Sequence, residues 1–370
     1  MAEIQQLVNA EYLQQVCAQV RRQCEAQKKV IALTREMLAL QRKKYSSYLS
    51  PHSDKSQLDT KQHLECRPRG ENEPGVLKSK RMDTTPVMPE FEALLDYFRQ
   101  KHGFDFTGYK RPSLMRRVQH RMQMIQIHSY CDYLDYLQVH PQEFVHLFTT
   151  ILINFTNFFR DASAWDYIAT QIVPQIVAGK SESEPIRIWS AGCASGEETY
   201  TLAMVLAEAQ GVAQYNARVQ IFGTDIDEEA INFARKGSYL SNQVVGIPPT
   251  LLERYFDQAD NRYIIRQDLR RKIIFCRHNL IQDAPMSKID LLVCRNVLIY
   301  FNTEAQIRAL ARFHFGLKDS GFLFLGSAEM VPTHTNFFTS VKKTHHVFTK
   351  VPKGDVNRCL LHEALIRQPL

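Results

Sequence analysis

The stretch IRIWSAGCASGEETYTLAMVL, residues 186–206, decides the fold. Its apolar start predicts a buried strand, its two glycines predict a tight turn, and the remainder predicts a helix. A strand, a glycine turn and a helix in this order usually hold a nucleotide-like ligand. The spacing is neither GxGxxG nor the GK[ST] of a phosphate loop, so the glycines alone do not identify the ligand.

The charges around this turn indicate what it binds. Gly192 and Gly196 let the backbone approach a ligand closely, but no Lys or Arg is present to hold a phosphate. Glu197 and Glu198 open the helix instead, and carboxylates there repel pyrophosphate and suit an ammonium or sulfonium group. The next apolar run ends at Asp225, where an acid commonly binds ribose hydroxyls. An unphosphorylated, cationic nucleoside indicates S-adenosylmethionine (SAM), with S-adenosylhomocysteine as the product.

The pattern around this motif predicts a doubly wound α/β sheet. Apolar runs that end in polar or small residues are typical of parallel strands with a ligand at their carboxyl edge. The expected strands are IRIWSA, VQIFGTD, IDLLVCRNV and GFLFLGSA, with VFTK as a late one, and helical patterns lie between them. Residues 240–275 interrupt this alternation. There we expect a helix in PPTLLERYF and a β-hairpin in NRYIIRQDLRRKIIF, which together form an inserted subdomain.

The chain before the sheet is predicted to be helical. Residues 4–46 have the pattern of one long amphipathic helix, which either pairs with a coiled-coil partner or packs on its own domain. Residues 50–88 are rich in Pro, Gly, Ser, Asp and Lys and predict a flexible linker. Residues 90–152 contain four helical segments. On the second, RPSLMRRVQHRMQMIQI, one arc is basic and consists of Arg116, Arg117, His120 and Arg121.

Composition excludes several classes of protein. The 370 residues are 44% hydrophobic and 23% charged, as in globular proteins. No apolar run approaches ~18 residues and no signal pattern is present at the N-terminus, so we expect a cytoplasmic protein without membrane insertion. The eight Cys form no CxxC pair, which argues against a zinc site and against a disulfide framework; we expect no metal. The net charge of +7 suits nucleic acid, an anionic membrane surface or an acidic protein.

Further motifs resemble a known family. They are NFTNFFRD before the sheet, FCRHNL, whose Asn-Leu end suits adenine, and CRNVLIYF at the end of the fourth strand. With YKRPSLMRRVQHRM, WSAGCASGEETYTLA and GTDIDEEAINFARKGSY, these segments resemble the CheR family of chemoreceptor protein-glutamate O-methyltransferases over residues 90–350. The resemblance implies methyl transfer from SAM to glutamate side chains of methyl-accepting chemotaxis receptors, which gives glutamyl methyl esters in sensory adaptation.

The resemblance over residues 90–350, with the periodicity and composition of the segments outside it, implies the domain organisation. We expect a small all-α domain and then a class I SAM-methyltransferase domain with a small β-subdomain. The expected segments are a long N-terminal helix over 1–49, a linker over 50–88, the helical CheR N-terminal-type domain over 89–160, the methyltransferase domain over 161–352 with its β-subdomain at about 240–275, and a C-terminal tail over 353–370.

Site residues follow from the turn and from the resemblance. The expected cofactor contacts are Asn154, Thr156, Arg160, Gly192, Glu198, Asp225, Asn279, Leu280, Arg295 and Asn296. A glutamate carboxylate, with a pKa of about 4.3, is already ionised at neutral pH and needs no general base. We therefore expect Arg160 to position the carboxylate and Tyr300 to donate a hydrogen bond to it. Arg116, Arg117 and Arg121 are expected to meet the acidic helices of the receptor.

Two other functions were weighed against this one. Base-amine methyltransferases of this fold usually carry a [DN]PP[YF]-type segment after the fourth strand, where this sequence has CRNVLIYF, so we expect no nucleic-acid substrate. A SAM-binding scaffold without catalysis is disfavoured by the intact Arg160, Asp225 and Tyr300. Members of the resembled family that dock on a receptor's C-terminal tail peptide tend to carry a longer turn with glycine at the position of residues 259–263. This turn is short and lacks glycine, so the resemblance does not imply that form of tethering.

Overall fold

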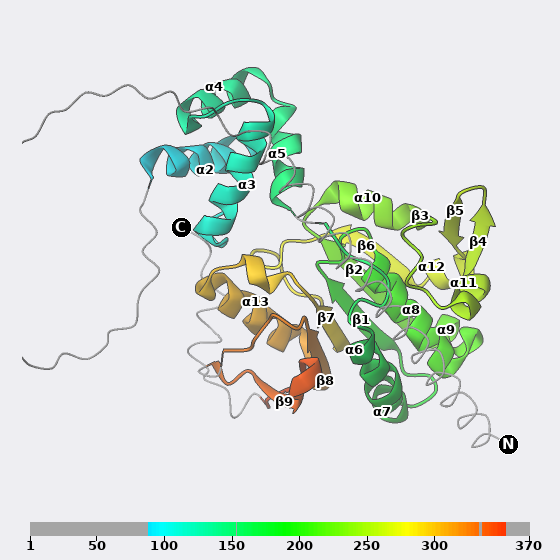
Figure 1. The fold of residues 1–370 in the computed structure, drawn as a ribbon. Helices are drawn as coiled ribbons and strands as arrows, with labels where there is room; N and C mark the ends of the chain where they lie inside the picture. The colour runs from blue at the N-terminus through cyan, green and yellow to red at the C-terminus, as the bar shows by residue number, and fades with distance from the viewer. Residues whose placement is uncertain (1–87, 153, 333–334, 353–370) are drawn as a thin grey trace, which may run out of the picture. The chain divides into compact units, whose positions relative to one another are not determined.

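The structure is a computed structural model and describes residues 88–152, 154–332 and 335–352 (Figure 1). The expectations for the long N-terminal helix, for residues 50–87 of the linker and for the tail over 353–370 lie outside the described residues. None of the helices in the described part of the chain has the length and apolar character needed to cross a bilayer.

Four helices form the first domain. They are α2 (Pro89–His102), α3 (Arg111–Met124), α4 (Tyr130–Val139) and α5 (Glu143–Ile151). Pro89 occupies the first turn of α2, where a missing N–H costs nothing, and Gly103 ends this helix with a φ of 64°. The Ser129 hydroxyl caps α4 by accepting a hydrogen bond from the backbone N–H of Asp132. The apolar sides of the four helices meet in a single core that includes Phe98, and α3 is left with a polar outer side.

A seven-stranded sheet forms the second domain, in the order β6-β2-β1-β7-β8-β10-β9. The strands are β1 (Ile186–Ala191), β2 (Val219–Asp225), β6 (Ile273–Arg277), β7 (Ile289–Cys294), β8 (Leu317–Leu325), β9 (Phe338–Lys342) and β10 (Val347–Lys350). The strands from β6 to β8 are parallel, and β10 runs antiparallel to both of its neighbours. The predicted doubly wound α/β fold is confirmed.

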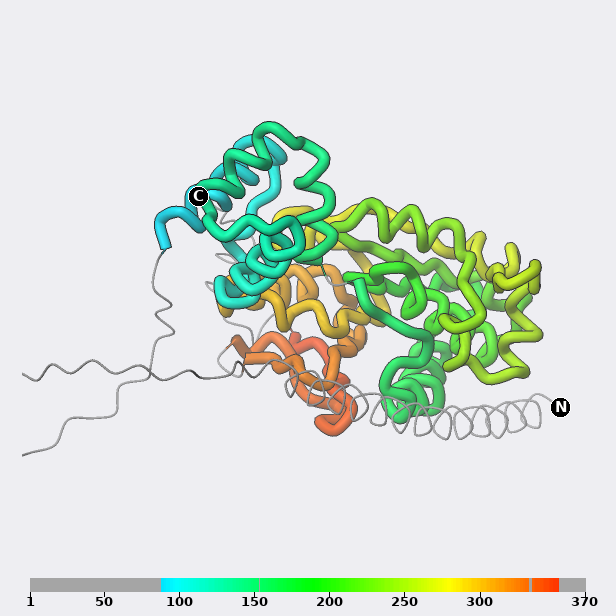
Figure 2. The backbone as a smooth tube through the Cα atoms, turned by 45° about the horizontal axis from the view of Figure 1, so that its top comes forward, coloured from blue at the N-terminus to red at the C-terminus, as the bar shows by residue number. Residues whose placement is uncertain are grey.

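Helices cover both faces of the sheet (Figures 1 and 2). Successive side chains of a strand point to opposite faces, so Ile188 of β1 joins one hydrophobic core and Trp189 joins the other. The helices are α6 (Ala162–Tyr167), η1 (Ile168–Ile172), α7 (Val173–Ala178), α8 (Glu197–Gln210), α9 (Val212–Arg218), α10 (Glu228–Lys236), α13 (Thr303–Gly316) and the short η2 (Leu298–Tyr300) and η4 (Lys343–His345). The first core packs against α6, η1, α7 and α8, and the second packs against α13.

The inserted subdomain differs from the prediction in one respect. The expected hairpin over NRYIIRQDLRRKIIF does not form. Instead, β5 (Arg262–Ile265) pairs with β4 (Phe256–Ala259) and β3 (Ser238–Leu240), whereas the end of the segment becomes β6 of the main sheet. The four-residue α12 (Gln267–Arg270) separates the two strands and is too short to show a helical period. The predicted helix is present as α11 (Pro249–Tyr255).

The helical domain is attached directly to the loop that follows β7. Tyr109 forms an antiparallel bridge with Phe301. The backbone N–H of Lys110 donates to the Tyr300 carbonyl at 2.9 Å, and the N–H of Asn302 donates to the Gly108 carbonyl at 2.9 Å. These bonds fix the start of α3, and hence its basic side, relative to the carboxyl ends of the strands.

Candidate active site

A cavity opens at the carboxyl ends of β1, β2, β6 and β7. It is lined by residues from α3, from the segment after α5 and from the loops that follow these four strands. The predicted residues that line it are Arg116, Arg117, Asn154, Thr156, Arg160, Gly192, Glu198, Asp225, Asn279, Leu280, Arg295, Asn296 and Tyr300. Parallel strands bring these positions, far apart in sequence, to one edge of the sheet.

The turn after β1 is folded tightly onto the end of β2. The backbone N–H groups of Gly192 and Cys193 both donate to the Thr224 carbonyl, at 2.7 and 2.9 Å. Gly192 has a φ of 78°, and a Cβ added there would lie 2.3 Å from a methyl carbon of Val297. Only glycine therefore permits both this backbone conformation and the close approach of the loop after β7.

Asp225 is oriented by the backbone around it. Its Oδ2 accepts from the N–H of Ala194 at 2.8 Å, and its Oδ1 accepts from the N–H of Asp227 at 3.0 Å. Burial raises the pKa of Asp225, and the two backbone donors oppose that effect. The carboxylate is therefore fixed in one orientation and keeps lone pairs that can accept hydrogen bonds from a diol in the cavity.

The two glutamates of the turn have different surroundings. Glu198 lines the cavity and accepts a hydrogen bond from the Ser190 hydroxyl at 3.0 Å. Burial raises the pKa of Glu198 to about 7, while the cationic Arg295 at 3.8 Å lowers it. Glu197 is not among the lining residues and accepts from the Ser195 hydroxyl at 2.6 Å. The side chain available to a ligand in the cavity is thus that of Glu198.

Arg295 joins two of the sequence motifs. Its side chain is 2% exposed, its Nη2 lies 2.5 Å from Asp161 Oδ2, and its guanidinium lies over the ring of Phe324. Among the described residues, neither Arg295 Nε nor Asn296 Oδ1 has a hydrogen-bond partner, although both atoms are buried. Buried polar atoms normally have partners, so these two atoms fit a polar ligand that occupies the cavity.

Asn154 and Asn279 line the cavity but are also held within the protein. The Asn154 amide donates to Asp227 Oδ2 at 2.5 Å. The Asn279 side chain accepts from the N–H of Ile281 at 2.9 Å and donates to Gln282 at 3.1 Å. Both side chains therefore stabilise the loops that form the cavity wall.

Arg160, Arg117 and Tyr300 lie close together at the cavity. Burial raises the pKa of Tyr300, and the positive charges of Arg117 and Arg160 oppose that rise. The phenol consequently stays protonated at neutral pH and can donate a hydrogen bond. Within the described chain, Arg160 makes one long hydrogen bond, at 3.4 Å to the carbonyl of Phe155, which leaves its other donors for a ligand.

Arg121, which the sequence assigned to the receptor-binding surface, does not line the cavity and pairs within the helical domain. Its Nε and Nη2 each donate to the carboxylate of Glu143 at 2.7 Å, and Tyr133 donates to the same carboxylate at 3.0 Å. The helical period placed Arg121 on the basic arc, but the packing of α5 supplies an acidic partner that the period does not reveal. The guanidinium is therefore a structural link between α3 and α5.

Three side chains at or behind the cavity were missed. Tyr109 begins the quoted motif YKRPSLMRRVQHRM and lines the cavity, where burial and the nearby Asp225 raise its pKa. His278 lines the cavity beside Trp189, with ring centroids 5.3 Å apart. Glu329 lies behind the loop that follows β7, and no motif marks it. Across residues 88–152, 154–332 and 335–352, no group of three or more His, Cys, Asp or Glu could hold a metal ion.

Comparisons with known proteins agree with the arrangement of the two domains. Residues 154–347 match the family described as "CheR methyltransferase, SAM binding domain", and residues 89–152 match "CheR methyltransferase, all-alpha domain". A chemotaxis protein methyltransferase from Borreliella burgdorferi is 30% identical over 254 residues, which cover 67% of this chain and 90% of that protein.

Two further relatives show how much of each protein is shared. The chemotaxis protein methyltransferase of Escherichia coli is 30% identical over 268 residues, which cover 70% of this chain and 91% of that protein. An uncharacterized 104.1 kDa protein from Rhodobacter capsulatus is 36% identical over 250 residues, 68% of this chain. The match covers 26% of that larger protein, so the chain spans about a quarter of this relative.

Proposed function

This chain belongs to the CheR methyltransferase family, and from that premise we propose that it transfers the methyl group of SAM to glutamate carboxylates of chemotaxis receptors. The observation that carries the proposal is the composition of the cavity. It combines the acids Asp225 and Glu198, suited to a ribose and an ammonium group, with the donors of Arg160 and Tyr300, suited to a carboxylate.

The cavity residues fit SAM without a phosphate-binding group. Asp225 would accept from the ribose hydroxyls, and Glu198 would hold the ammonium group. Asn279 and Leu280 would contact the adenine, and the unpaired Oδ1 of Asn296 offers an acceptor to the cofactor. When bound, SAM supplies a methyl group made electrophilic by the attached sulfonium.

Catalysis by this chain is a matter of orientation rather than of proton transfer. The acceptor carboxylate is ionised at neutral pH, so the protein needs no base to activate it. Arg160 and the phenol of Tyr300 would hold the carboxylate in line with the methyl group, and the closed cavity would exclude water. Because the carboxylate loses its charge during the transfer, Arg160 acts in positioning and not in stabilising the transition state.

The basic side of α3 suits an acidic partner. Arg116 is exposed, Arg117 is half-buried, and both line the cavity from the helical domain. An acidic receptor helix that lies against them would place a glutamate beside Arg160. The β4–β5 turn at Asp260 lacks glycine, which favours recognition through this side of α3 rather than through a receptor tail. A cytoplasmic location follows from the same partner.

A labelled-methyl assay tests the proposal. The full chain is incubated with methyl-labelled SAM and cytoplasmic fragments of receptors, and Asp225→Asn serves as the inactive control. Label in the receptor that is released by mild base identifies a glutamyl methyl ester and supports the proposal. Label in RNA or DNA, or S-adenosylhomocysteine binding without any transfer, would overturn it in favour of a nucleic-acid methyltransferase or a scaffold.

A further inference from the structure

Glu329 is a buried carboxylate that lies outside the cavity and is held by backbone groups. It follows β8 and is 3% exposed. Its Oε1 accepts from the N–H groups of Val297 and Leu298, both at 2.7 Å. Its Oε2 accepts from the N–H of Gly326, also at 2.7 Å. One side chain thus ties the loop after β7 to the loop after β8 through three charge-assisted hydrogen bonds.

The loop held in this way carries part of the active site. Asn296, directly before the anchored residues, has a φ of 62° and lines the cavity with an unpaired Oδ1 among the described atoms. Tyr300 follows at the end of η2. Asn adopts this left-handed conformation more readily than most non-glycine residues, so the chain turns here without a glycine. The bonds from Glu329 to the next two residues hold the turn in place.

The packing around Glu329 leaves the loop little room to move. A Cβ added at Gly326 would lie 2.8 Å from the backbone nitrogen of Asn296 and 2.9 Å from Glu329 Oε2. On the other side, the ring of His346 lies 2.8 Å from the carbonyl oxygen of Glu329 through its Nδ1. The carboxylate is therefore anchored between the two loops rather than exchanging with solvent.

We propose that Glu329 is a positioning residue for methyl transfer: its carboxylate fixes the loop over 296–300 so that Asn296 and Tyr300 face the cavity in the arrangement that the reaction requires. This inference rests on the proposed function for its consequence in catalysis. Its consequence for cofactor binding is independent of which protein accepts the methyl group.

The charge of Glu329 affects the pH dependence of cofactor binding, which a purely structural role would leave unchanged. Burial raises the pKa of Glu198 to about 7, with Arg295, Ser190 and Arg160 lowering it and the negative charge of Glu329 adding to the rise. Replacing Glu329 by the isosteric Gln removes that charge. The pH at which Glu198 ionises should then fall, and cofactor affinity should persist to lower pH than in the unchanged protein.

Glu329→Gln and Glu329→Asp, made in the full chain, test the inference. We expect the affinity for S-adenosylhomocysteine, measured by calorimetry, to fall about 5- to 10-fold in Glu329→Gln at pH 8, and kcat to fall at least about 10-fold, since all three anchoring bonds lose their charged acceptor. The KM for the receptor should change less than twofold. Amide hydrogen exchange in the peptide over 294–302 should accelerate, because Val297 and Leu298 lose a charged acceptor.

The matched control is Glu304→Gln, the same chemical change at a side chain that is 67% exposed on α13 and pairs with Arg308. It should leave affinity, exchange and kcat unchanged. Glu329→Asp, too short to reach both loops, should resemble Glu329→Gln in exchange but keep the pH profile of the unchanged protein.

Two results would overturn the inference. The first is that, in both variants of Glu329, the affinity for S-adenosylhomocysteine, kcat and the rate of amide hydrogen exchange all stay within twofold of the unchanged protein. The other is a loss that is spread over the whole chain in hydrogen exchange, with no shift of the pH profile in Glu329→Gln, which would make the residue merely structural. Binding of S-adenosylhomocysteine needs no receptor, so a failed receptor assay and a failed inference remain distinguishable.

Discussion

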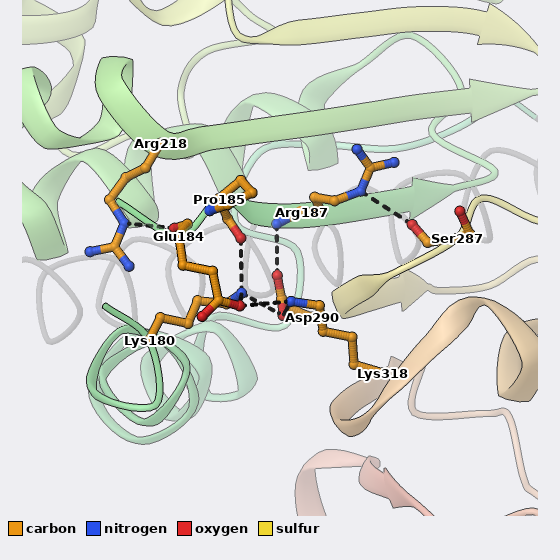
Figure 3. A network of polar contacts seen from close by, with 8 residues as sticks. All are labelled: Lys180, Glu184, Pro185, Arg187, Arg218, Ser287, Asp290 and Lys318. Carbon is orange, nitrogen blue, oxygen red and sulfur yellow. Dashed lines mark hydrogen bonds and ion pairs between the residues drawn. The ribbon is translucent and has the colours of Figure 1, made fainter. Parts of the chain in front are cut away.

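The two ends of the parallel strands carry charged clusters that are built in opposite ways. At the amino ends, Lys180, Glu184, Asp290 and Lys318 satisfy one another (Figure 3). At the carboxyl ends, Arg295 and Asn296 line the cavity, and each has one buried hydrogen-bonding atom that lacks a partner within the described residues. Both clusters contain buried polar side chains of the same domain, so the contrast separates polar groups that stabilise the fold from those that serve a ligand.

The amino-end cluster leaves little for a ligand to bind. Asp290 Oδ1 lies 3.0 Å from Lys180 Nζ and 3.3 Å from Lys318 Nζ, and its Oδ2 accepts from the N–H of Arg187 at 2.8 Å. Lys180 also donates to the Pro185 carbonyl at 2.8 Å. The side chains of Lys180 and Asp290 are only 6% and 5% exposed, so this pairing is what makes their burial tolerable.

The carboxyl-end cluster is incompletely paired. Glu198 lies 3.8 Å from its nearest cation, Arg295, and burial raises its pKa to about 7. Asn296 Oδ1 and Arg295 Nε have no partner in the described chain. At the amino end the lysines and carboxylates are paired, although the buried Nη2 of Arg218, which donates through Nε to the Glu184 carbonyl, has no partner among the described residues. Unsatisfied burial therefore marks the site where several such atoms belong to residues that line one cavity.

The largest expected effect is on stability and comes from a substitution in the amino-end cluster. Asp290→Ala removes one of the two carboxylates paired with the buried Lys180 and the acceptor of the Arg187 N–H, and it should lower the free energy of unfolding by about 3 kcal/mol. Urea denaturation measures this loss. The affinity for S-adenosylhomocysteine at a temperature where the variant is folded should be unchanged. A selective loss of affinity at full stability would show that the two ends are not independent.

The next effect concerns the carboxyl end. Asp225→Asn keeps the shape of the side chain but places an amide where both oxygens accept backbone N–H groups and where the ribose would bind. We expect the affinity for S-adenosylhomocysteine to fall about 100-fold, as for the loss of hydrogen bonds to a charged group. Calorimetry measures the affinity. Urea denaturation measures the accompanying loss of stability, which should be about 1 to 2 kcal/mol because the amide NH2 faces one of the two backbone N–H donors.

The sequence predicts most of the central strands of the sheet but not its edge. The strands β1, β2, β7 and β8 are nearly continuous apolar runs, a pattern that burial on both faces produces, so they were found. β9 was not found, because it is an edge strand in which only Phe338 is buried. The short α12 joins the apolar residues of β5 to those of β6, which is why a hairpin was expected there.

The sequence predicts the cavity residues that lie in recognisable motifs. It does not predict side chains whose hydrogen-bond partners are distant in the sequence. Asp225 ends β2 and Asn296 lies two residues after the end of β7, and their meeting follows from the fold class. The pairing of Arg121 was missed because nothing in its own helix reveals Glu143, 22 residues away. Glu329 has no motif and acts on a loop 31 and 32 residues earlier, so only coordinates reveal it.

A pH titration compares two glutamates, one from each cluster. The pKa of Glu198 is raised to about 7 by burial, so this side chain loses its charge as the pH falls below 7. The affinity for S-adenosylhomocysteine, which carries an ammonium group, should therefore be about tenfold lower at pH 6 than at pH 8. Glu198→Gln should bind weakly at both values, whereas Glu197→Gln should keep the dependence. A flat profile in the unchanged protein would contradict the raised pKa.

The charge of Glu184, in the amino-end cluster, should not change between pH 6 and pH 8. Hydrogen bonds from Lys180 and Lys318 lower the pKa of Glu184 to about 2. A carboxylate with a lowered pKa stabilises the fold above its unfolded value of about 4.5 and loses that contribution as the pH falls toward 2. Glu184→Gln should therefore leave the pH dependence of unfolding between 6 and 8 unchanged. A change in that window would mean that its pairs with the lysines do not hold.

The last prediction concerns the basic side chains at the rim of the cavity. Arg117→Glu on α3 should lower kcat/KM for the receptor about 10-fold, since a charge reversal at an interface acts mainly on encounter and orientation, and it should leave the affinity for S-adenosylhomocysteine intact. Lys101→Glu, the same reversal at an exposed residue of α2, is the matched control and should change neither value. Raising the salt concentration should reduce the difference between the unchanged protein and Arg117→Glu, because screening weakens rim charges. Equal losses in receptor methylation and in cofactor affinity would instead assign Arg117 to cofactor binding, and the cofactor site would then include the helical domain.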